Sequence, residues 1–532
     1  MFLFSPYVPS RVTFRAWHRS TPNAPAIRTN WPNEYWTLRR VRRGTHNPLA
    51  TPNPLWHRLS VESEVLRGAA LEPTSSAQSG VPKSPVRPPQ NAGGKVTTEI
   101  AVANQLGIAL AADSAVTITG GGHTKVFDTA DKLFELSGAF PVAVMINGNM
   151  NCLGTPWEIL IKNFRSSEGA TARGSIEKWA RDFLAYVENH DPGAEETEGG
   201  YIDRVIRAEI AAVQESTMAV VAEFVYQASR GSDHVLTRGD LDIRKVLAAA
   251  VRLRGEALDQ YAVVPALAEI GKDALQGKYG ERINAALDAA FQKATDEEKA
   301  SIKLLIIEAL MRATDSDAAA GIAVAGYGTD DMFPAIFSAE IDGRVSGKLK
   351  IYKEKYATIA SCADGGMVTS FAQTDVIERL LRGVDPRFVT RSGSFIERAV
   401  KDAMQKGFEA SDKKKPSKKV LAEREKLATE MAEAARGEYQ DKAAGKIKEN
   451  FAREFDGMIA MMPKQELIEL AEALVSITAI ERKATVDEGT VGGPVDVALI
   501  TKHEGFVWIK RKHHFPRDLN PRYFYRKFGT AP

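Results

Sequence analysis

Thr97, Asp113 and Lys132 have the residue types of a nucleophile, an orienting acid and an activating cation. A threonine hydroxyl is a weak nucleophile at neutral pH and needs a base beside it. A free α-amino group on the same residue, with a pKa of about 8, can be that base. Such a base exists only if Thr97 is the first residue of the mature chain. Because a nearby lysine ammonium lowers the pKa of the amine and the hydroxyl, and a carboxylate holds the lysine, the three residues indicate amide hydrolysis.

Short apolar runs around these residues predict the strands that bring them together. Residues 100–103 and 108–112 are two such runs with a turn between them, which predicts a β-hairpin. The threonine precedes the first strand, the acid follows the second, and the lysine begins a third predicted strand at 132–136. A fourth strand is predicted at 142–146. This geometry places the three residues at one end of the hairpin.

The rest of the sequence alternates between helical regions and short strands. Good helix formers predict helices at about 155–312, 370–436 and 465–480, the first of them capped by Thr155 with Pro156 in its first turn. Further strands are predicted at 321–326, 335–341, 356–361, 495–500 and 505–509, with Asp342-Gly343 as a turn and 119–130 as a loop. This order predicts an α+β fold in which two mostly antiparallel sheets lie between helical layers.

The composition is that of an ordinary globular protein and does not point to a nucleic-acid partner. Apolar residues make up 44% and charged residues 26% of the 532 residues, and the formal net charge is +2. Cys152 and Cys362 provide neither a disulfide framework nor a metal clamp, which favours a reducing, cytoplasmic setting. The apolar stretches are too short to cross a bilayer, so no membrane partner is expected.

The sequence resembles the proteasome β-subunit type of N-terminal-nucleophile (Ntn) hydrolase. The resemblance rests on Thr-Thr-Glu-Ile-Ala-Val at 97–102, Gly-Ile-Ala-Leu-Ala-Ala-Asp-Ser at 107–114 and Lys-Leu-Phe-Glu-Leu at 132–136. It extends to the last strands, through Gly-Gly-Pro-Val-Asp-Val at 492–497 and Glu-Gly-Phe-Val at 504–507. The resemblance implies a four-layer αββα sandwich and a threonine-type endopeptidase that needs no metal or organic cofactor.

The resemblance also implies a role for each candidate site residue. Thr97 corresponds to the nucleophile, and Asp113 and Lys132 correspond to its acid and lysine, with Lys125 as the competing lysine. The remaining counterparts are Gly148 for the oxyanion-binding backbone N–H, and Asp487 and Thr490 for the groups that support the terminal amine, with Glu488 as the competing acid.

The family's assembly and domain plan give further expectations. Its members form rings that enclose their active sites, which implies a homo-oligomer that cleaves peptides or unfolded proteins, with an ATP-dependent unfoldase as a possible partner. The Ntn hydrolase domain is expected at 97–515, with a basic aromatic tail at 516–532. The helical insertion at about 151–317 is much longer than the family's helix pair, and the helices at about 370–480 form the other layer.

Residues 1–96 stand in front of the expected nucleophile and block its amine. They are rich in proline and arginine and nearly free of acids, which is typical of a disordered segment. One interpretation is a propeptide removed by self-cleavage. The interpretation that we favour is a misplaced gene start, in which a GTG codon for Val96 begins translation and trimming of the initiator exposes Thr97.

Two other functions remain open for this sequence. An enlarged insertion could shape a private pocket, so that the same nucleophile acts as an amidohydrolase on a small amide. A catalytically silent, proteasome-like structural subunit is the other alternative. The lysine-rich run at 413–419 is followed by acids and has no interleaved aromatics, so it indicates a solvated connection between helices instead of a nucleic-acid site.

Overall fold

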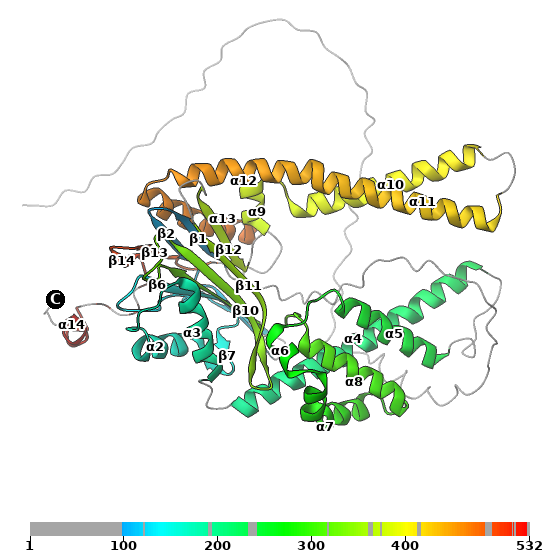
Figure 1. The fold of residues 1–532 in the computed structure, drawn as a ribbon, viewed down its shortest axis with the longest axis horizontal. Helices are drawn as coiled ribbons and strands as arrows, with labels where there is room; N and C mark the ends of the chain where they lie inside the picture. Colours follow the sequence, from blue (N-terminus) through cyan, green and yellow to red (C-terminus); the bar gives the residue numbers. More distant parts are fainter. Residues whose placement is uncertain are drawn as a thin grey trace, which may run out of the picture. The chain divides into compact units, whose positions relative to one another are not determined.

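The computed structural model describes residues 98–120, 123–189, 194–231, 242–316, 319–359, 365–372, 375–411, 416–484, 492–512, 514, 516 and 518–528. These residues belong to one compact unit, Gly68–Pro532 (Figure 1). The leader at 1–96, Thr97, Asp487, Glu488 and Thr490 lie outside the described residues.

The first sheet is built around the N-terminal hairpin. Its strands run in the order β12-β1-β2-β13-β14, and every neighbouring pair is antiparallel. The bounds are β1 (Thr98–Asn104), β2 (Gly107–Ala112), β12 (Met367–Ala372), β13 (Asp496–Thr501) and β14 (Gly505–Lys510). All residues of β1 and β2 are buried. Strands covered on both faces are apolar throughout instead of alternating, which explains the continuous apolar runs of this hairpin.

The second sheet contains the strand that follows Lys132. Its order is β11-β10-β9-β6-β5, again with antiparallel neighbours only. The bounds are β5 (Leu133–Glu135), β6 (Val142–Gly148), β9 (Ala320–Gly326), β10 (Ala335–Val345) and β11 (Lys348–Thr358). Short hairpins also form from β3 (Val116–Gly120) with β4 (His123–Phe127), and from β7 (Asn151–Cys152) with β8 (Thr155–Pro156).

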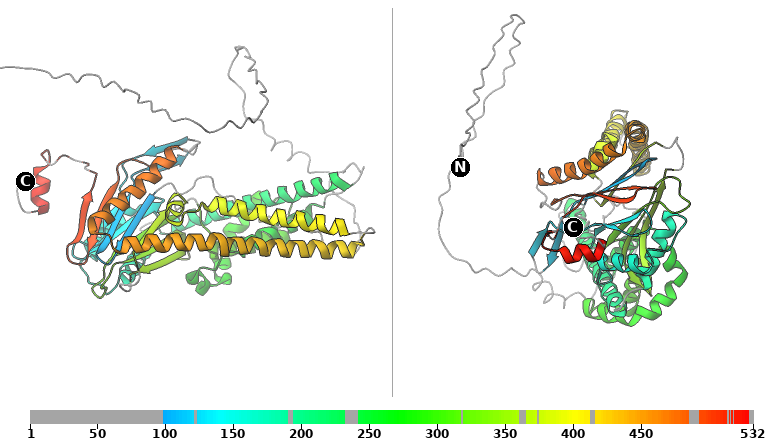
Figure 2. Two further views of the ribbon diagram at one scale, coloured as in Figure 1. Left: turned by 90° about the horizontal axis from the view of Figure 1, so that it is seen from above. Right: turned by 90° about the vertical axis from the view of Figure 1, so that its left-hand side faces the viewer.

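The core consists of apolar layers on both faces of each sheet. Between the sheets, Ala101 and Leu110 share a cluster with Met145 and Ala323. On the other face of the first sheet lie α9 (Asp375–Arg382), α12 (Gly445–Ala460) and α13 (Lys464–Ala484), and on that of the second lie α2 (Trp157–Ser167) and α3 (Ile176–Asn189). Figure 2 shows the sheets with helices on either side. Each sheet therefore has an apolar layer on its inner face and another on its outer face.

A further block of helices follows α3 and has a core of its own. It comprises α4 (Ala194–Gly231), α5 (Ile243–Leu258), α6 (Pro265–Ile270), α7 (Lys272–Ala290) and α8 (Asp296–Met311). Ile202, Leu267, Ile283 and Ile306 are among the fully buried residues of that core. The helices have little strand character in their sequence, and α8 begins with a capping box formed by Thr295 and Glu298.

Buried polar groups join this block to the second sheet. The Tyr201 hydroxyl donates to Asp342 Oδ2 at 2.5 Å, and Ser316 N donates to Asp342 Oδ1 at 2.8 Å. Lys350 Nζ lies 3.6 Å from the same carboxylate and donates to Ala309 O at 3.2 Å and Thr314 Oγ1 at 3.1 Å. Burial, reinforced by the Asp342 charge, raises the pKa of Tyr201 well above its usual range, so the phenol stays protonated.

The remaining helices are α10 (Pro386–Ser411), α11 (Lys418–Glu438), the π-helical turn η2 (Tyr439–Ala444) and α14 (Pro521–Phe528). In Figure 1, α10 and α11 run side by side, and α11 continues through η2 into α12. The tail expected at 516–532 therefore contains a helix, α14.

The α+β class predicted from the sequence is confirmed, together with the first hairpin and the last two strands. Several local predictions are wrong. Residues 370–372, placed at the start of a helix, belong instead to strand β12, because Val368, Thr369 and Phe371 are strand formers that pair with β1. Part of the loop expected at 119–130 belongs to the β3–β4 hairpin.

Two predicted boundaries also differ from the structure. Asp342-Gly343 is not a turn but lies within β10, at an irregularity where the pairing register with β11 shifts. The Asp342 side chain accepts a hydrogen bond from the Tyr201 hydroxyl. The turn comes later, at Ser346-Gly347, so β11 starts well before the predicted 356. Thr155 does not cap a helix, because it pairs with Cys152, and α2 begins at Trp157.

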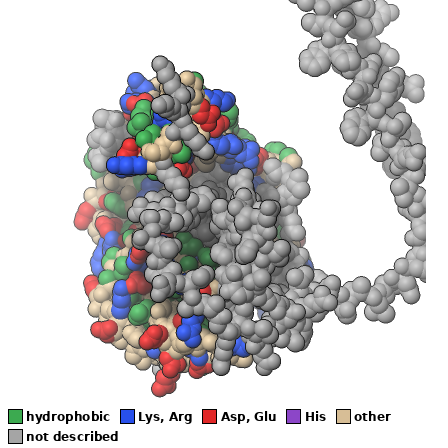
Figure 3. Space-filling model, turned by 90° about the vertical axis from the view of Figure 1, so that its right-hand side faces the viewer, with side chains coloured by type: hydrophobic (Ala, Val, Ile, Leu, Met, Phe, Trp, Pro, Cys, Tyr) green, Lys and Arg blue, Asp and Glu red, His purple; other side chains and the backbone are tan. Residues whose placement is uncertain are grey.

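The described surface shows mixed charge and no membrane-spanning element. On the face drawn in Figure 3, the described basic and acidic side chains are interspersed. Among the residues that the structure describes, none of the helices combines the length and apolar character that crossing a bilayer requires.

We expect the hydrogen bond from Tyr201 to Asp342 to stabilise the attachment of the helical block. Tyr201→Phe leaves a buried carboxylate oxygen without its hydroxyl donor, which should lower the free energy of unfolding by about 2 kcal/mol. The matched control is Tyr525→Phe, because Tyr525 is 61% exposed. Urea unfolding of both variants measures the difference, and equal midpoints would contradict the role given to this bond.

Candidate active site

The Asp113 carboxylate receives hydrogen bonds from four parts of the chain. Oδ1 accepts from Thr98 N at 3.1 Å and from Lys132 Nζ at 2.6 Å. Oδ2 accepts from Ala115 N and Gly492 N, both at 3.2 Å. The aspartate is only 1% exposed. These donors replace the hydration that a carboxylate loses on burial.

Lys132 lies between the two sheets, immediately before β5, with a fully buried side chain. Besides its contact with Asp113, its Nζ lies 4.0 Å from Glu99 Oε1, whose side chain is also fully buried. Ile146 N donates to Lys132 O at 2.9 Å, which attaches the backbone of the lysine to β6. The ammonium thus shares Asp113 Oδ1 with Thr98 N, at the start of β1.

The structure distinguishes the two lysines that the sequence left open. Lys125 is in β4, is exposed, and places its Nζ 4.7 Å from the centroid of the Phe127 ring. Lys132, in contrast, contacts Asp113 directly. The lysine that accompanies Asp113 is therefore Lys132.

Gly148 is at the C-terminal end of β6, the end beside Lys132. Its φ is +71°, and a Cβ added there would lie 2.6 Å from Ala319 O, so glycine is required. N–H groups two residues apart in a strand point to the same side, and Ile146 N points to Lys132 O. The Gly148 N–H is therefore directed past the start of β5, where it is suited to bind an oxyanion.

The other predicted site residues are outside the described part of the chain. No contact is described for Thr97, Asp487 or Thr490. Their neighbours in sequence do reach the site: Thr98 N donates to Asp113, and Gly492 N donates to the same carboxylate. At Gly493 the φ is +76°, and an added Cβ would lie 2.4 Å from Asp128 O, which accounts for a glycine at that position.

Sequence reasoning missed a second polar cluster behind Asp113. Lys512 follows β14 and contacts Ser114, Asp496 and Asp131. His514 Nε2 lies 3.2 Å from Asp131 Oδ1. The only signal in the sequence was a lysine shortly after the strand predicted at 505–509. Spacing alone could not pair it with Ser114 and Asp131, which lie near the other end of the domain.

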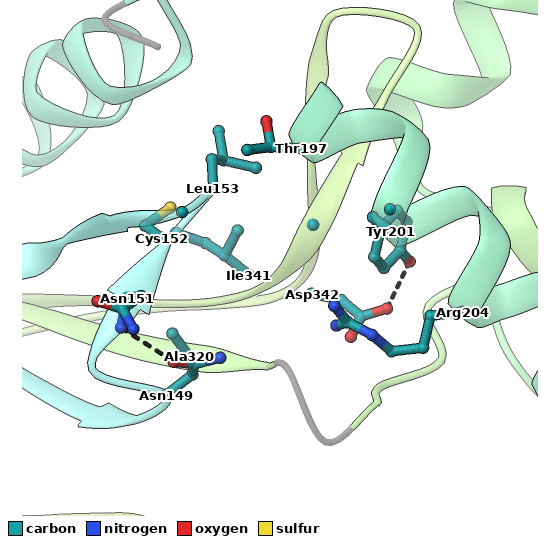
Figure 4. A pocket seen from close by; sticks show the side chains of 13 residues that line it. Asn149, Asn151, Cys152, Leu153, Thr197, Tyr201, Arg204, Ala320, Ile341 and Asp342 are labelled. Atoms are coloured by element: carbon teal, nitrogen blue, oxygen red, sulfur yellow. Dashed lines mark hydrogen bonds between the residues drawn. The ribbon is translucent and has the colours of Figure 1, made fainter. Parts of the chain in front are cut away.

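A pocket of about 340 Å³ begins at Asn149, the residue after Gly148 (Figure 4). Neither Gly148 nor the Asp113–Lys132 pair lines it. One wall comes from Asn149 and Asn151, which follow β6, and from Ala320 of β9. The opposite wall comes from α4, where the Tyr201 hydroxyl points to Asp342 and Arg204 extends toward the same carboxylate. The helical block therefore forms one wall of this pocket.

The described residues contain no group of three or more His, Cys, Asp or Glu side chains arranged to hold a metal ion. No protein-family model matches this chain, and no curated protein matches it significantly.

We predict that the two lysines differ sharply in their effect on stability. Lys132→Ala leaves the buried Asp113 charge without its cation, which should cost about 3–5 kcal/mol of unfolding free energy. Lys125→Ala removes an exposed side chain and should change it by less than about 0.5 kcal/mol. Chemical denaturation measures both, and similar losses would show that the Lys132 ion pair does not stabilise the fold.

Proposed function

We propose that this protein is a threonine-type peptidase of the proteasome-like Ntn class, with Thr97 as its N-terminal nucleophile. The observation that carries the proposal is the position of Asp113, which binds both Thr98 N and the Lys132 ammonium at the end of β1. A nucleophile that directly precedes Thr98 would stand beside this buried ion pair. The packing of helices on the outer faces of both sheets supports the αββα sandwich of that class.

The proposed reaction uses the terminal amine of Thr97 as the proton carrier. The amine accepts the hydroxyl proton while Oγ attacks the peptide carbonyl carbon, and the Gly148 N–H stabilises the oxyanion. The protonated amine then gives the proton to the leaving amine, and the C–N bond breaks to leave an ester on Thr97. Water, deprotonated by the same amine, hydrolyses the ester and restores the enzyme. Asp487 and Thr490, shortly before Gly492, would support the amine.

The proposal extends to assembly and location. A peptidase of this class works as a homo-oligomeric ring on peptides or unfolded proteins, with an unfoldase as its partner, and the cysteine usage favours the cytoplasm. Against a catalytically silent structural subunit stands the buried Asp113–Lys132 pair, because two desolvated charges are costly to retain without a role.

The nucleophile and its maturation are tested together. We expect N-terminal sequencing of the native protein to begin at Thr97, and we expect purified mature protein to hydrolyse peptides. Thr97→Ala should reduce kcat by at least about a thousandfold, whereas Thr97→Ser, which keeps a hydroxyl, should retain measurable turnover. A native chain that keeps residues 1–96, or full activity of Thr97→Ala, would refute the proposal.

A second candidate function is hydrolysis of a small amide by the same nucleophile. The pocket that begins at Asn149 favours it, because part of its wall comes from the helical block. Gly200 lines this pocket on α4, and an added Cβ meets nothing within 4 Å. Gly200→Leu can therefore fill the pocket without disturbing the helix.

The same variant separates the two functions. If the substrate is a small amide, Gly200→Leu should lower kcat/KM for it by at least about tenfold, through the loss of pocket volume. If the substrate is an extended polypeptide, cleavage of an unfolded protein should change by less than about threefold. The matched control is Gly277→Leu in α7, which also adds a side chain into open space.

A further inference from the structure

Lys512 is a buried lysine just after β14, with a side chain only 5% exposed. Its Nζ donates to Ser114 Oγ at 2.8 Å and to Asp496 Oδ2, and lies 3.5 Å from Asp131 Oδ1. Its backbone N–H also donates to Asp496 Oδ1 at 2.9 Å. One residue near the C-terminal end of the last strand thus binds three distant segments.

Each of these segments carries part of the candidate site. Ser114 directly follows Asp113, and Asp131 directly precedes Lys132. Asp496 begins β13 opposite Ala112, at the end of the strand that leads into Asp113. Lys512 therefore contacts the residues next to Asp113 and Lys132 in the sequence, and the strand end that pairs with Ala112.

The chemistry of an ammonium group fixes the direction of the Ser114 hydroxyl. Lysine can only donate hydrogen bonds, so Ser114 Oγ must accept from Lys512 and direct its own proton to Pro494 O. Ser114 N also donates to Gly492 O at 3.1 Å. These bonds hold residues 492–494 against Ser114, and from that position Gly492 N donates to Asp113 Oδ2.

We propose that Lys512 is a positioning residue for the Asp113–Lys132 pair and that it acts through Ser114 and the Gly492–Pro494 segment. This rests on the proposed function, because it assigns a catalytic consequence to that geometry. The competing explanation is purely structural: Lys512 neutralises the Asp496 carboxylate, which is 2% exposed.

Ser114→Ala separates the two explanations. It removes the hydroxyl but leaves the ion pair between Lys512 and Asp496 intact, whereas Lys512→Met removes both. The control is Lys510→Met, in the same segment, whose side chain is 54% exposed and pairs with Glu472. Thermal unfolding should show a clear loss for Lys512→Met and little change for the other two variants.

The first readout does not depend on activity. Hydrogen exchange measured by mass spectrometry should accelerate at least tenfold in peptides covering 112–116 and 492–497, in both Ser114→Ala and Lys512→Met, and not in Lys510→Met. Unchanged exchange in Ser114→Ala would overturn the positioning role, even if the wild-type protein hydrolyses nothing. Inactivity of the wild type would instead count against the proposed function.

The second readout is turnover by mature wild-type protein and the variants. Ser114→Ala and Lys512→Met should each lower kcat at least tenfold with KM within twofold of wild type, and the double variant should lose no more than Lys512→Met alone. Full kcat in Ser114→Ala would leave Lys512 as a counter-ion for Asp496 and would overturn the inference.

Discussion

The burial of the Asp113 carboxylate is the constraint on which the rest of the site depends. A carboxylate removed from water is tolerated only if donors replace the lost hydration. Here the donors come from β1, from the loop after β2, from the lysine before β5 and from Gly492 before β13. The single group therefore connects the two sheets and both ends of the domain, and none of its partners can move without leaving part of the charge unsatisfied.

Much of the fold followed from local pattern. The apolar runs of β1, β2, β6 and β13 are unbroken because each strand is buried, and such runs are recognisable in one sequence. Strand β12 was missed because its polar and apolar residues, Met-Val-Thr-Ser-Phe-Ala, precede a helix and lack a turn signal. Its identity depends on pairing with β1, a long-range contact that no local pattern contains.

The candidate site was predictable in its residue types and only partly in its geometry. Spacing from a hairpin placed Asp113 and Lys132 together, since strand ends meet at a known place. The sequence alone could not decide between Lys132 and Lys125. The decision depends on the strand that follows Lys132 joining the second sheet, whereas the strand that contains Lys125 forms a separate hairpin. Lys512 and Ser114 were beyond reach for the same reason, as their contact is made only after the last strand has paired with β2 through β13.

The strand order of the first sheet has a consequence for how the protein is made. The hairpin β1–β2 lies in the centre of that sheet, yet its outer partners, β12 and β13, are translated hundreds of residues later. Contacts of such sequence separation form slowly and late. A nascent or truncated chain that ends before Gly492 lacks that donor as well as β13 and Lys512, so its Asp113 has an incomplete set of donors. The chain order thereby delays completion of the Asp113 donor set until Gly492 and the strand that follows it have been made.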